Sequence, residues 1–329
     1  CNPAYGFRPA KTKSYSTPAY TVNPKRSVPF DRFYVISEGK IDGLGYKSWG
    51  IKFAPMSGKS AEKTPDRITV KVIKNLNQIE NEFLKVRIFN DCQVDLYDKK
   101  SGMLYKKIHF FEDCGDAGDG WNHFYPENDT VVLSNKKENI KNRKIEILET
   151  GPFRASIRAS MSMLIPKSLA EDKKSRSTDR VLIDIATTFT LKSGKRRLEC
   201  KTEICNRSEC HRLRLLFPTR IESNLWYGDT AFDVVGRNVI LPDTSGWNEK
   251  ARRESPIKNF LAVCDNRSGL AILTKGINEG CVLDDMERTI ALTLFRSFSE
   301  NLYNEKTKDS LLIGNLSAEY AIVPFNVER

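Results

Sequence analysis

A loop rich in aspartate, glycine and aromatic residues is the part of this sequence best suited to chemistry. Asp113, Asp116 and Asp119 recur at intervals of three among glycines, and the largely aromatic run 121–125 follows. The glycines remove any helical or sheet preference, so residues 112–126 are predicted to form a loop. Carboxylates accept hydrogen bonds from hydroxyl groups, and an aromatic face covers the apolar side of a sugar ring. We therefore expect this loop to contact a polyol, with a solvated surface turn as the alternative interpretation.

The same aspartates could also act as a carboxylate pair. Two carboxylates side by side raise the pKa of one of them, as a general acid requires. In a glycine-rich loop, however, such side chains more often cap backbone N–H groups or contact substrate, so autonomous catalysis is not expected. The spacing of three also departs from the alternating ligand positions of an EF-hand loop, and it gives calcium binding no support.

The eight cysteines are too dilute for a disulfide scaffold, and only Cys200, Cys205 and Cys210 cluster, next to His211. Each gap contains four residues, and an offset of five along a strand places Cys200 and Cys205 on opposite faces. Zinc sites favour closer ligand pairs on a tight turn. We therefore expect isolated reduced thiols, no metal in this chain, and a reducing, cytoplasmic location.

The acidic loop must be held by β-strands, because the sequence around it alternates between apolar and polar residues. Residues 82–89 and 92–97 alternate on either side of Asn90-Asp91, which predicts a hairpin. A second turn at 98–102 leads to a strand at 104–111 and then to the loop. Further strands are predicted at 43–51, 144–148, 153–163, 180–191, 197–204, 211–217, 260–264, 271–274, 289–295 and 319–323. Helical periodicity is nearly absent, so the predicted class is all-β with antiparallel sheets.

Length and composition indicate a globular chain of one large domain or two domains. The 329 residues are 40% hydrophobic and 29% charged, and nowhere do eighteen apolar residues run together, so no membrane partner is expected. Six prolines in the first 60 residues favour edge strands or a wrapping segment. We predict an N-terminal segment over 1–75, part of a small β-subdomain, and a main domain over 76–329 that is truncated at its C-terminal end. The chain does not begin with Met and opens without the features of a signal peptide, so we interpret it as a fragment of a longer polypeptide.

The net charge of +11 raises the question of nucleic-acid binding. The densest basic tracts, 136–144 and 173–180, are mixed with polar residues in predicted connecting segments and contain no aromatic residues for base stacking. We therefore expect solvated loops and no nucleic-acid partner.

Five segments in the same order resemble the C-terminal β-domain of glycoside hydrolase family 38, the α-mannosidases. They are the strand pair at 79–86 and 96–102, the acidic loop 112–126, and the segments 149–155, 211–219 and 291–297. Any one match is weak, but five in register are fairly specific. The resemblance covers roughly residues 40–325 of this sequence.

The resemblance implies a large antiparallel supersandwich of the galactose-mutarotase type, preceded in the whole enzyme by an α/β barrel and a short helical bundle. Members are zinc-dependent retaining enzymes whose nucleophile and zinc ligands belong to that N-terminal part. This sequence contains none of it and has only three histidines. The resemblance therefore implies a catalytic barrel of the same polypeptide as partner, a mannoside as substrate, and an isolated chain that is inactive.

The resemblance also implies that the acidic loop reaches toward the barrel and lines the sugar cleft. Trp121 stands where relatives typically have a tyrosine, which leaves ring stacking in place of a hydroxyl contact. The residues expected to face the substrate are Asp116, Asp119, Trp121, Asn122 and Arg296. For Arg296 the equal alternative is an ordinary arginine at a strand end. Arg212 and Arg214 alternate with leucines and are predicted to be structural, on the face opposite the core.

Three functions remain open from the sequence. The leading one is the non-catalytic β-domain of an α-mannosidase, whose docking face forms an exposed apolar patch or is covered in a homo-oligomer. The second is an independent carbohydrate-binding β-sandwich that uses the same loop. The third is a mutarotase-like enzyme, for which His123 and Asp119 are the nearest histidine and carboxylate.

Overall fold

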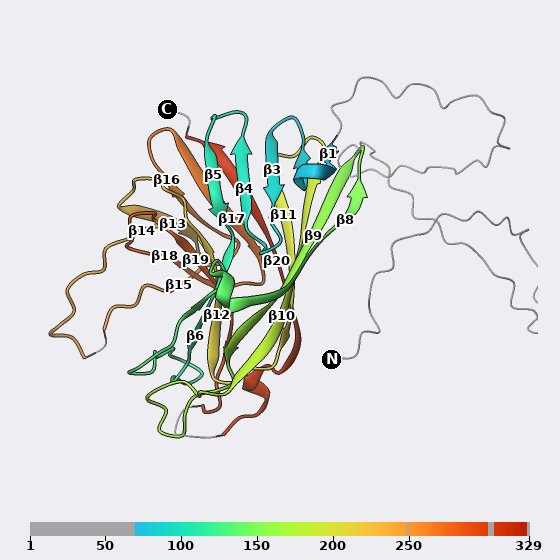
Figure 1. The fold of residues 1–329 in the computed structure, drawn as a ribbon. Coiled ribbons are helices and arrows are strands. Elements are labelled where there is room, and N and C mark those ends of the chain that lie inside the picture. Colours follow the sequence, from blue (N-terminus) through green and yellow to red (C-terminus); the bar gives the residue numbers. More distant parts are fainter. Residues whose placement is uncertain (1–69, 249, 302–305, 328–329) are drawn as a thin grey trace, which may run out of the picture. The chain divides into compact units, whose positions relative to one another are not determined.

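The computed structural model describes residues 70–248, 250–301 and 306–327, which form three antiparallel sheets (Figure 1). The strand predicted at 43–51 and most of the N-terminal segment 1–75 lie outside the described residues. Among the described residues the helical elements are short 3-10 turns, namely η1 (Lys74–Leu76), η2 (Lys137–Asn139) and η4 (Asp309–Leu311). These described helical turns are far too short to span a lipid bilayer. The predicted all-β, antiparallel class is confirmed.

A five-stranded sheet is a simple meander in which each strand pairs with the next along the chain. Its strands are β1 (Lys71–Ile73), β2 (Gln78–Glu80), β3 (Leu84–Ile88), β4 (Val94–Asp98) and β5 (Leu104–Ile108). Buried and exposed residues alternate along β3, so one face packs inward. The predicted hairpin is the β3–β4 pair.

A nine-stranded sheet has the order β14-β13-β16-β17-β20-β11-β10-β9-β8. Its bounds are β8 (Ile140–Thr150), β9 (Arg154–Pro166), β10 (Arg180–Lys192), β11 (Leu198–Asn206), β13 (Leu225–Asp229), β14 (Val234–Asn238), β16 (Phe260–Cys264), β17 (Ser268–Lys275) and β20 (Gly314–Asn326). The long β-branched runs of β9 and β10 pair over thirteen residues, as their composition favours. Strands β13 and β14 were not predicted, because neither alternates regularly.

A six-stranded sheet has the order β15-β18-β19-β12-β6-β7 and carries the acidic loop. Its bounds are β6 (Phe110–Gly115), β7 (Val132–Leu133), β12 (His211–Phe217), β15 (Ser255–Pro256), β18 (Glu279–Val282) and β19 (Ile290–Ser297). Strand β12 is central, paired with β19 on one side and β6 on the other. The two strands that hold the ends of the candidate site, β6 and β19, therefore lie on either side of β12.

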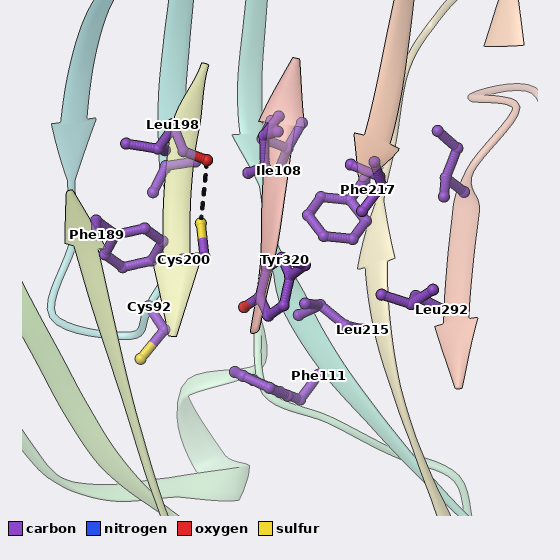
Figure 2. Close-up of a cluster of buried hydrophobic side chains, with 14 of the residues drawn as sticks. Cys92, Ile108, Phe111, Phe189, Leu198, Cys200, Leu215, Phe217, Leu292 and Tyr320 are labelled. Carbon is purple, nitrogen blue, oxygen red and sulfur yellow. Dashed lines mark hydrogen bonds between the residues drawn. The ribbon is translucent and has the colours of Figure 1, made fainter. Parts of the chain in front are cut away.

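One hydrophobic core joins residues of all three sheets, as expected of a supersandwich. Figure 2 shows Phe111, Phe189, Phe217 and Tyr320 gathered in it from different strands. Within the core His109 is fully buried, and its ring nitrogens lie 2.7 Å from the Cys92 carbonyl and 2.6 Å from the Tyr320 hydroxyl. His109 has φ +70° and separates β5 from β6, so the strand predicted at 104–111 is broken there.

Candidate functional site

The acidic loop begins later than predicted, because β6 continues to Gly115. Asp113 therefore lies within the strand, fully buried, and does not face solvent or ligand. Its carboxylate is 2.6 Å from Arg176 and 2.5 Å from the His211 ring. A buried carboxylate needs such cationic and hydrogen-bonding partners to offset its lost hydration. The prediction that the loop starts at residue 112 was wrong, and Asp113 belongs to a buried network with Arg176 and His211.

Asp116 and Arg296 are brought together by the fold. Asp116 is 1% exposed, and its Oδ2 accepts a hydrogen bond of 2.8 Å from Arg296 Nε. The Arg296 guanidinium also donates to the backbone carbonyls of Asp119 and Asn122, both at 2.8 Å. A planar guanidinium can serve several acceptors at fixed angles, which an ammonium cannot. Arg296 thus clamps the loop from β19, and the two side chains are bonded to each other within it.

Asp119 organises the tip of the loop through its own backbone. Its Oδ1 accepts the N–H groups of Trp121 and Asn122, each at 2.8 Å. These hydrogen bonds, that from Asn122 foremost, hold the pKa of Asp119 below its ordinary value. A short aspartate side chain that caps nearby amides in this way stabilises a tight turn. Asp119 therefore shapes the turn that carries Trp121.

Glycine is required at one position of this turn. A Cβ on Gly118 would lie 1.8 Å from the Asn122 carbonyl oxygen, far inside any real contact. The loop closes further through the Ala117 N–H, which donates to the Phe124 carbonyl at 2.8 Å. The glycines of the sequence pattern therefore allow the chain to fold back on itself.

Trp121 is the candidate residue whose side chain is not used to hold the loop together. Its side chain is 67% exposed, and Asn122 beside it is half-buried. Of the five residues expected to face a substrate, Asp116, Asp119 and Arg296 are engaged in holding the loop. An exposed indole on a loop fixed at both ends is suited to stacking against a sugar ring.

A second segment, residues 252–254, contacts the acidic loop and β12, and sequence reasoning missed its role. Arg252 stacks on the Phe124 ring at 4.9 Å and donates to the His123 carbonyl at 3.3 Å. Glu254 approaches Arg212 at 2.7 Å and Arg214 at 3.1 Å. The segment and the acidic loop therefore contact each other. A signal was present in the alternation of Arg212 and Arg214 with leucines, but nothing in the sequence identified Glu254 as their partner.

Arg212 and Arg214 lie on the face of β12 opposite the core, yet both are buried. Arg212 donates to the Tyr125 hydroxyl at 2.6 Å, and Arg214 approaches Glu112 at 2.6 Å. The surrounding acids raise the pKa of both guanidinium groups, against the opposing effect of burial. These arginines fix the acidic loop and Glu254 to the sheet, which is a structural role.

The histidines and cysteines of the described chain do not fit a zinc site. Among the described residues no three His, Cys, Asp or Glu side chains are grouped to hold a metal. His109 and His211 use both ring nitrogens in hydrogen bonds, and His123 Nε2 lies 3.0 Å from the Gly115 carbonyl. Metal-binding imidazoles need a free nitrogen and neighbouring ligands. Zinc chemistry is therefore not assigned to any residue here.

The clustered cysteines differ from one another. Cys200 and Cys210 are free thiols, whereas Cys205 is disulfide-bonded, so the expectation of isolated reduced thiols was wrong for Cys205. Burial raises the pKa of the Cys114 thiol, beside the acidic loop, to about 12. A thiol that stays protonated is a poor nucleophile.

His123 stacks edge-on against Tyr125 at 4.6 Å and hydrogen-bonds to the backbone. These contacts hold His123 in the packing around the loop.

Exposed large apolar side chains are concentrated in two stretches of the sequence. The acidic loop and the residues after it contribute Trp121, Phe124, Tyr125 and Val131, and the stretch 225–247 contributes Leu225, Phe232, Val234, Val235, Ile240 and Trp247. Exposed apolar residues concentrated in this way mark interaction surfaces more often than scattered ones do.

Comparison with known proteins places most of the chain in one family. Residues 79–304 match the family described as Glycosyl hydrolases family 38 C-terminal domain. A putative mannosylglycerate hydrolase of Halalkalibacterium halodurans is 27% identical over 268 residues, which are 76% of this chain and 29% of that protein. The crystal structure of an alpha-mannosidase from Enterococcus faecalis V583 superposes with a TM-score of 0.72 at 28% identity, over 79% of this chain and 30% of that chain. A second family 38 structure from Enterococcus faecalis gives a TM-score of 0.70 at 27% identity, over 82% and 32%. This chain therefore spans less than a third of each of these proteins.

Proposed function

This chain belongs to glycosyl hydrolase family 38 through that family's C-terminal domain, and on that premise we propose that it is the non-catalytic β-domain of a zinc-dependent retaining α-mannosidase. In the intact enzyme it supports the catalytic barrel and lines the sugar cleft with Trp121 and Asn122. The single observation that carries this role is an exposed indole on a loop clamped by Arg296 and Asp116. A cleft between domains is where ligand sites commonly arise.

Zinc and the nucleophile are assigned to the part of the polypeptide outside this chain. The length of the relatives supports such a part, because this chain spans 29% to 32% of them. Zinc, when bound there, would act as a Lewis acid and orient the substrate. The residues described here would supply stacking, loop rigidity and exclusion of water from one side of the cleft.

The substrate is proposed to be an α-mannoside. One relative is named as a putative mannosylglycerate hydrolase and another as an alpha-mannosidase, so mannosylglycerate and a simple aryl α-mannoside are the first substrates to assay.

We also propose a cytoplasmic location. Six unpaired cysteines among the described residues favour a reducing compartment, whereas the disulfide at Cys205 weighs against it. Cell fractionation with an antibody against this chain decides between the compartments.

Reconstitution tests the role directly. This chain and the remaining part of the polypeptide are produced separately, mixed, and assayed for hydrolysis of both α-mannosides with added zinc and with a chelator. The proposal requires activity in the mixture with zinc and none in this chain alone. Hydrolysis by this chain alone would overturn the proposal. So would a hydrolysis rate of the mixture, or of the intact polypeptide, that is no higher than the rate of the other part alone.

The second candidate is an independent carbohydrate-binding sandwich, which the exposure of Trp121, Phe124 and Trp247 favours. Calorimetric titration of this chain with methyl α-mannoside separates the two. Binding by the isolated chain with an affinity equal to that of the intact polypeptide supports the binding module, whereas binding that requires the intact polypeptide supports the enzyme domain.

A further inference from the structure

The free edge of β14 differs from the other sheet edges in the described part of the chain. β1, β7 and β15 are only two or three residues long, and β15 contains Pro256. β8 carries Lys141, Arg143 and Lys144 and has two register irregularities, while β5 carries two lysines and one irregularity. Short length, lysine, proline and bulges are the ways in which proteins keep sheet edges from pairing with further strands. Those five edges are therefore protected.

β14 has few of these protections. Its sequence is Val234-Val235-Gly236-Arg237-Asn238, without lysine, proline or a register irregularity, and among the strands that the structure describes it pairs with β13 alone. Four of its five residues are exposed. Phe232 at the hairpin tip is fully exposed, and Ile240 just after the strand is 58% exposed. An edge of this kind, bordered by apolar side chains, is suited to accept another strand.

The pairing register identifies which backbone groups are available. The N–H of Thr230 donates to Asp233 and the N–H of Val239 donates to Asn224. Hydrogen-bonded pairs alternate along an antiparallel ladder, so Val235 and Arg237 also bond to β13, and Val234, Gly236 and Asn238 point the other way. The Val234 N–H is capped by Asp233 Oδ1 at 2.7 Å. The N–H groups of Gly236 and Asn238 therefore face the open side of the sheet.

The surroundings favour the rest of the polypeptide as the occupant over a second copy. This chain spans about 30% of its relatives, so most of the polypeptide lies outside it. Arg252, which follows β14 in the chain, contacts Phe124 of the acidic loop, so the chain that leaves this edge returns to the loop proposed to line the cleft. A second copy would bring together two chains of net charge +11, and charge of one sign opposes association.

We propose that the free edge of β14 receives a β-strand from the part of the same polypeptide outside this chain, which extends the nine-stranded sheet. The inference rests on the proposed function in one respect, that the chain is a domain of a longer protein. The added strand would accept hydrogen bonds from Gly236 and Asn238 and cover Val234 and Phe232.

Hydrogen exchange measured by mass spectrometry tests the proposal on the isolated 329-residue chain and on the full polypeptide. We expect the Gly236 and Asn238 amides to exchange at least about tenfold more slowly in the full polypeptide, because pairing requires local opening before exchange. β8 amides serve as the internal reference and should exchange equally in both. Equal exchange rates of the β14 amides in the two forms would overturn the proposal. Protection that appears in the isolated chain and grows with its concentration would also overturn it, because it would indicate that a second copy occupies the edge.

A matched pair of variants sharpens the test. Gly236→Pro removes the outward N–H without removing a bond to β13, as an edge strand tolerates, whereas Gly236→Ala keeps the N–H and places its Cβ in ordinary contact with Tyr227. Protection at Asn238 should be lost with proline and kept with alanine in the full polypeptide only. An equal effect of the two variants, or an equal loss in both forms of the protein, contradicts the proposal. α-Mannoside hydrolysis measured on the same preparations tests the proposed function separately. If the full polypeptide hydrolyses the substrate but its β14 amides are not protected, only the added strand is overturned. If the β14 amides are protected but the substrate is not hydrolysed, only the enzyme role is overturned.

Discussion

Arg296 Nε lies 2.8 Å from Asp116 Oδ2, although 180 residues separate the two in the sequence. The carboxylate is fully shielded from solvent and the guanidinium nearly so. The same guanidinium also binds two backbone carbonyls of the acidic loop. This one side chain therefore neutralises the Asp116 carboxylate and holds the conformation of the loop that presents Trp121.

Replacement of Arg296 by alanine should destabilise the fold by about 3 kcal/mol, because removing one member of a buried pair leaves the other charge unpaired. Urea denaturation measures the loss, and NMR relaxation of the assigned Trp121 indole N–H, one of four in the chain, reports the mobility of the loop. Arg296→Lys keeps the charge but loses the forked contacts, so it should recover part of the stability and leave the indole mobile. An alanine variant as stable as the parent would refute the clamp.

Gly118→Ala should disrupt the loop, because the new methyl group would overlap the Asn122 carbonyl oxygen. Overpacking of this severity costs about 1–3 kcal/mol. Gly246→Ala is the matched control, since its Cβ would meet nothing within 4 Å. The two melting temperatures are compared by circular dichroism. Equal melting temperatures would show that the turn adapts without cost.

The stability of the described domain should fall as the pH drops below about 6.5. Burial lowers the pKa of His109 to about 4 from its ordinary 6.5, so the unfolded chain binds a proton that the folded chain does not. This contribution is fully present above pH 6.5, decreases as the pH falls, and is lost as the pH passes through 4, amounting to about 3 kcal/mol. Burial lowers the pKa of His123 in the same direction. NMR of the histidine rings checks the origin: a His109 resonance that titrates near its ordinary pKa of 6.5 would contradict it.

The buried cysteines should be inert in the native chain. Burial raises the pKa of Cys92, Cys114 and Cys281 to about 12, and thiols rather than thiolates react slowly. A thiol reagent at about pH 8, near the ordinary pKa of a free thiol, followed by peptide mass spectrometry should label Cys264, which is partly exposed, well before these three. All three should become reactive in denaturant. Rapid native labelling of Cys114 would place it at the surface.

The alternation of apolar and polar residues was sufficient to predict the all-β fold class and the position of most strands. β9 and β10 are long, β-branched and paired as their pattern indicates, and Arg212 and Arg214 lie on the predicted face of β12. The exposed strand β14 was not predicted because an edge strand open to solvent on both faces need not alternate. Local sequence also could not reveal that Asp113 belongs to a strand, because the partners that neutralise it, Arg176 and His211, are distant in the sequence. Trp121 was proposed from its aromatic type and from the family resemblance, and its role stays a prediction, whereas the engagement of Arg296 and Asp119 inside the loop required the three-dimensional contacts.

The most direct test of the proposed role is the hydrolysis of an α-mannoside by the intact polypeptide carrying Trp121→Ala, with Met286→Ala as control. Both side chains are more than half exposed, so neither change should alter stability by more than about 0.5 kcal/mol. We predict that kcat/KM falls about tenfold for Trp121→Ala, as expected when a stacking contact of about 1.4 kcal/mol is lost, and is unchanged for Met286→Ala. An unchanged kcat/KM for Trp121→Ala in a stable protein would contradict the claim that this β-domain lines the sugar cleft.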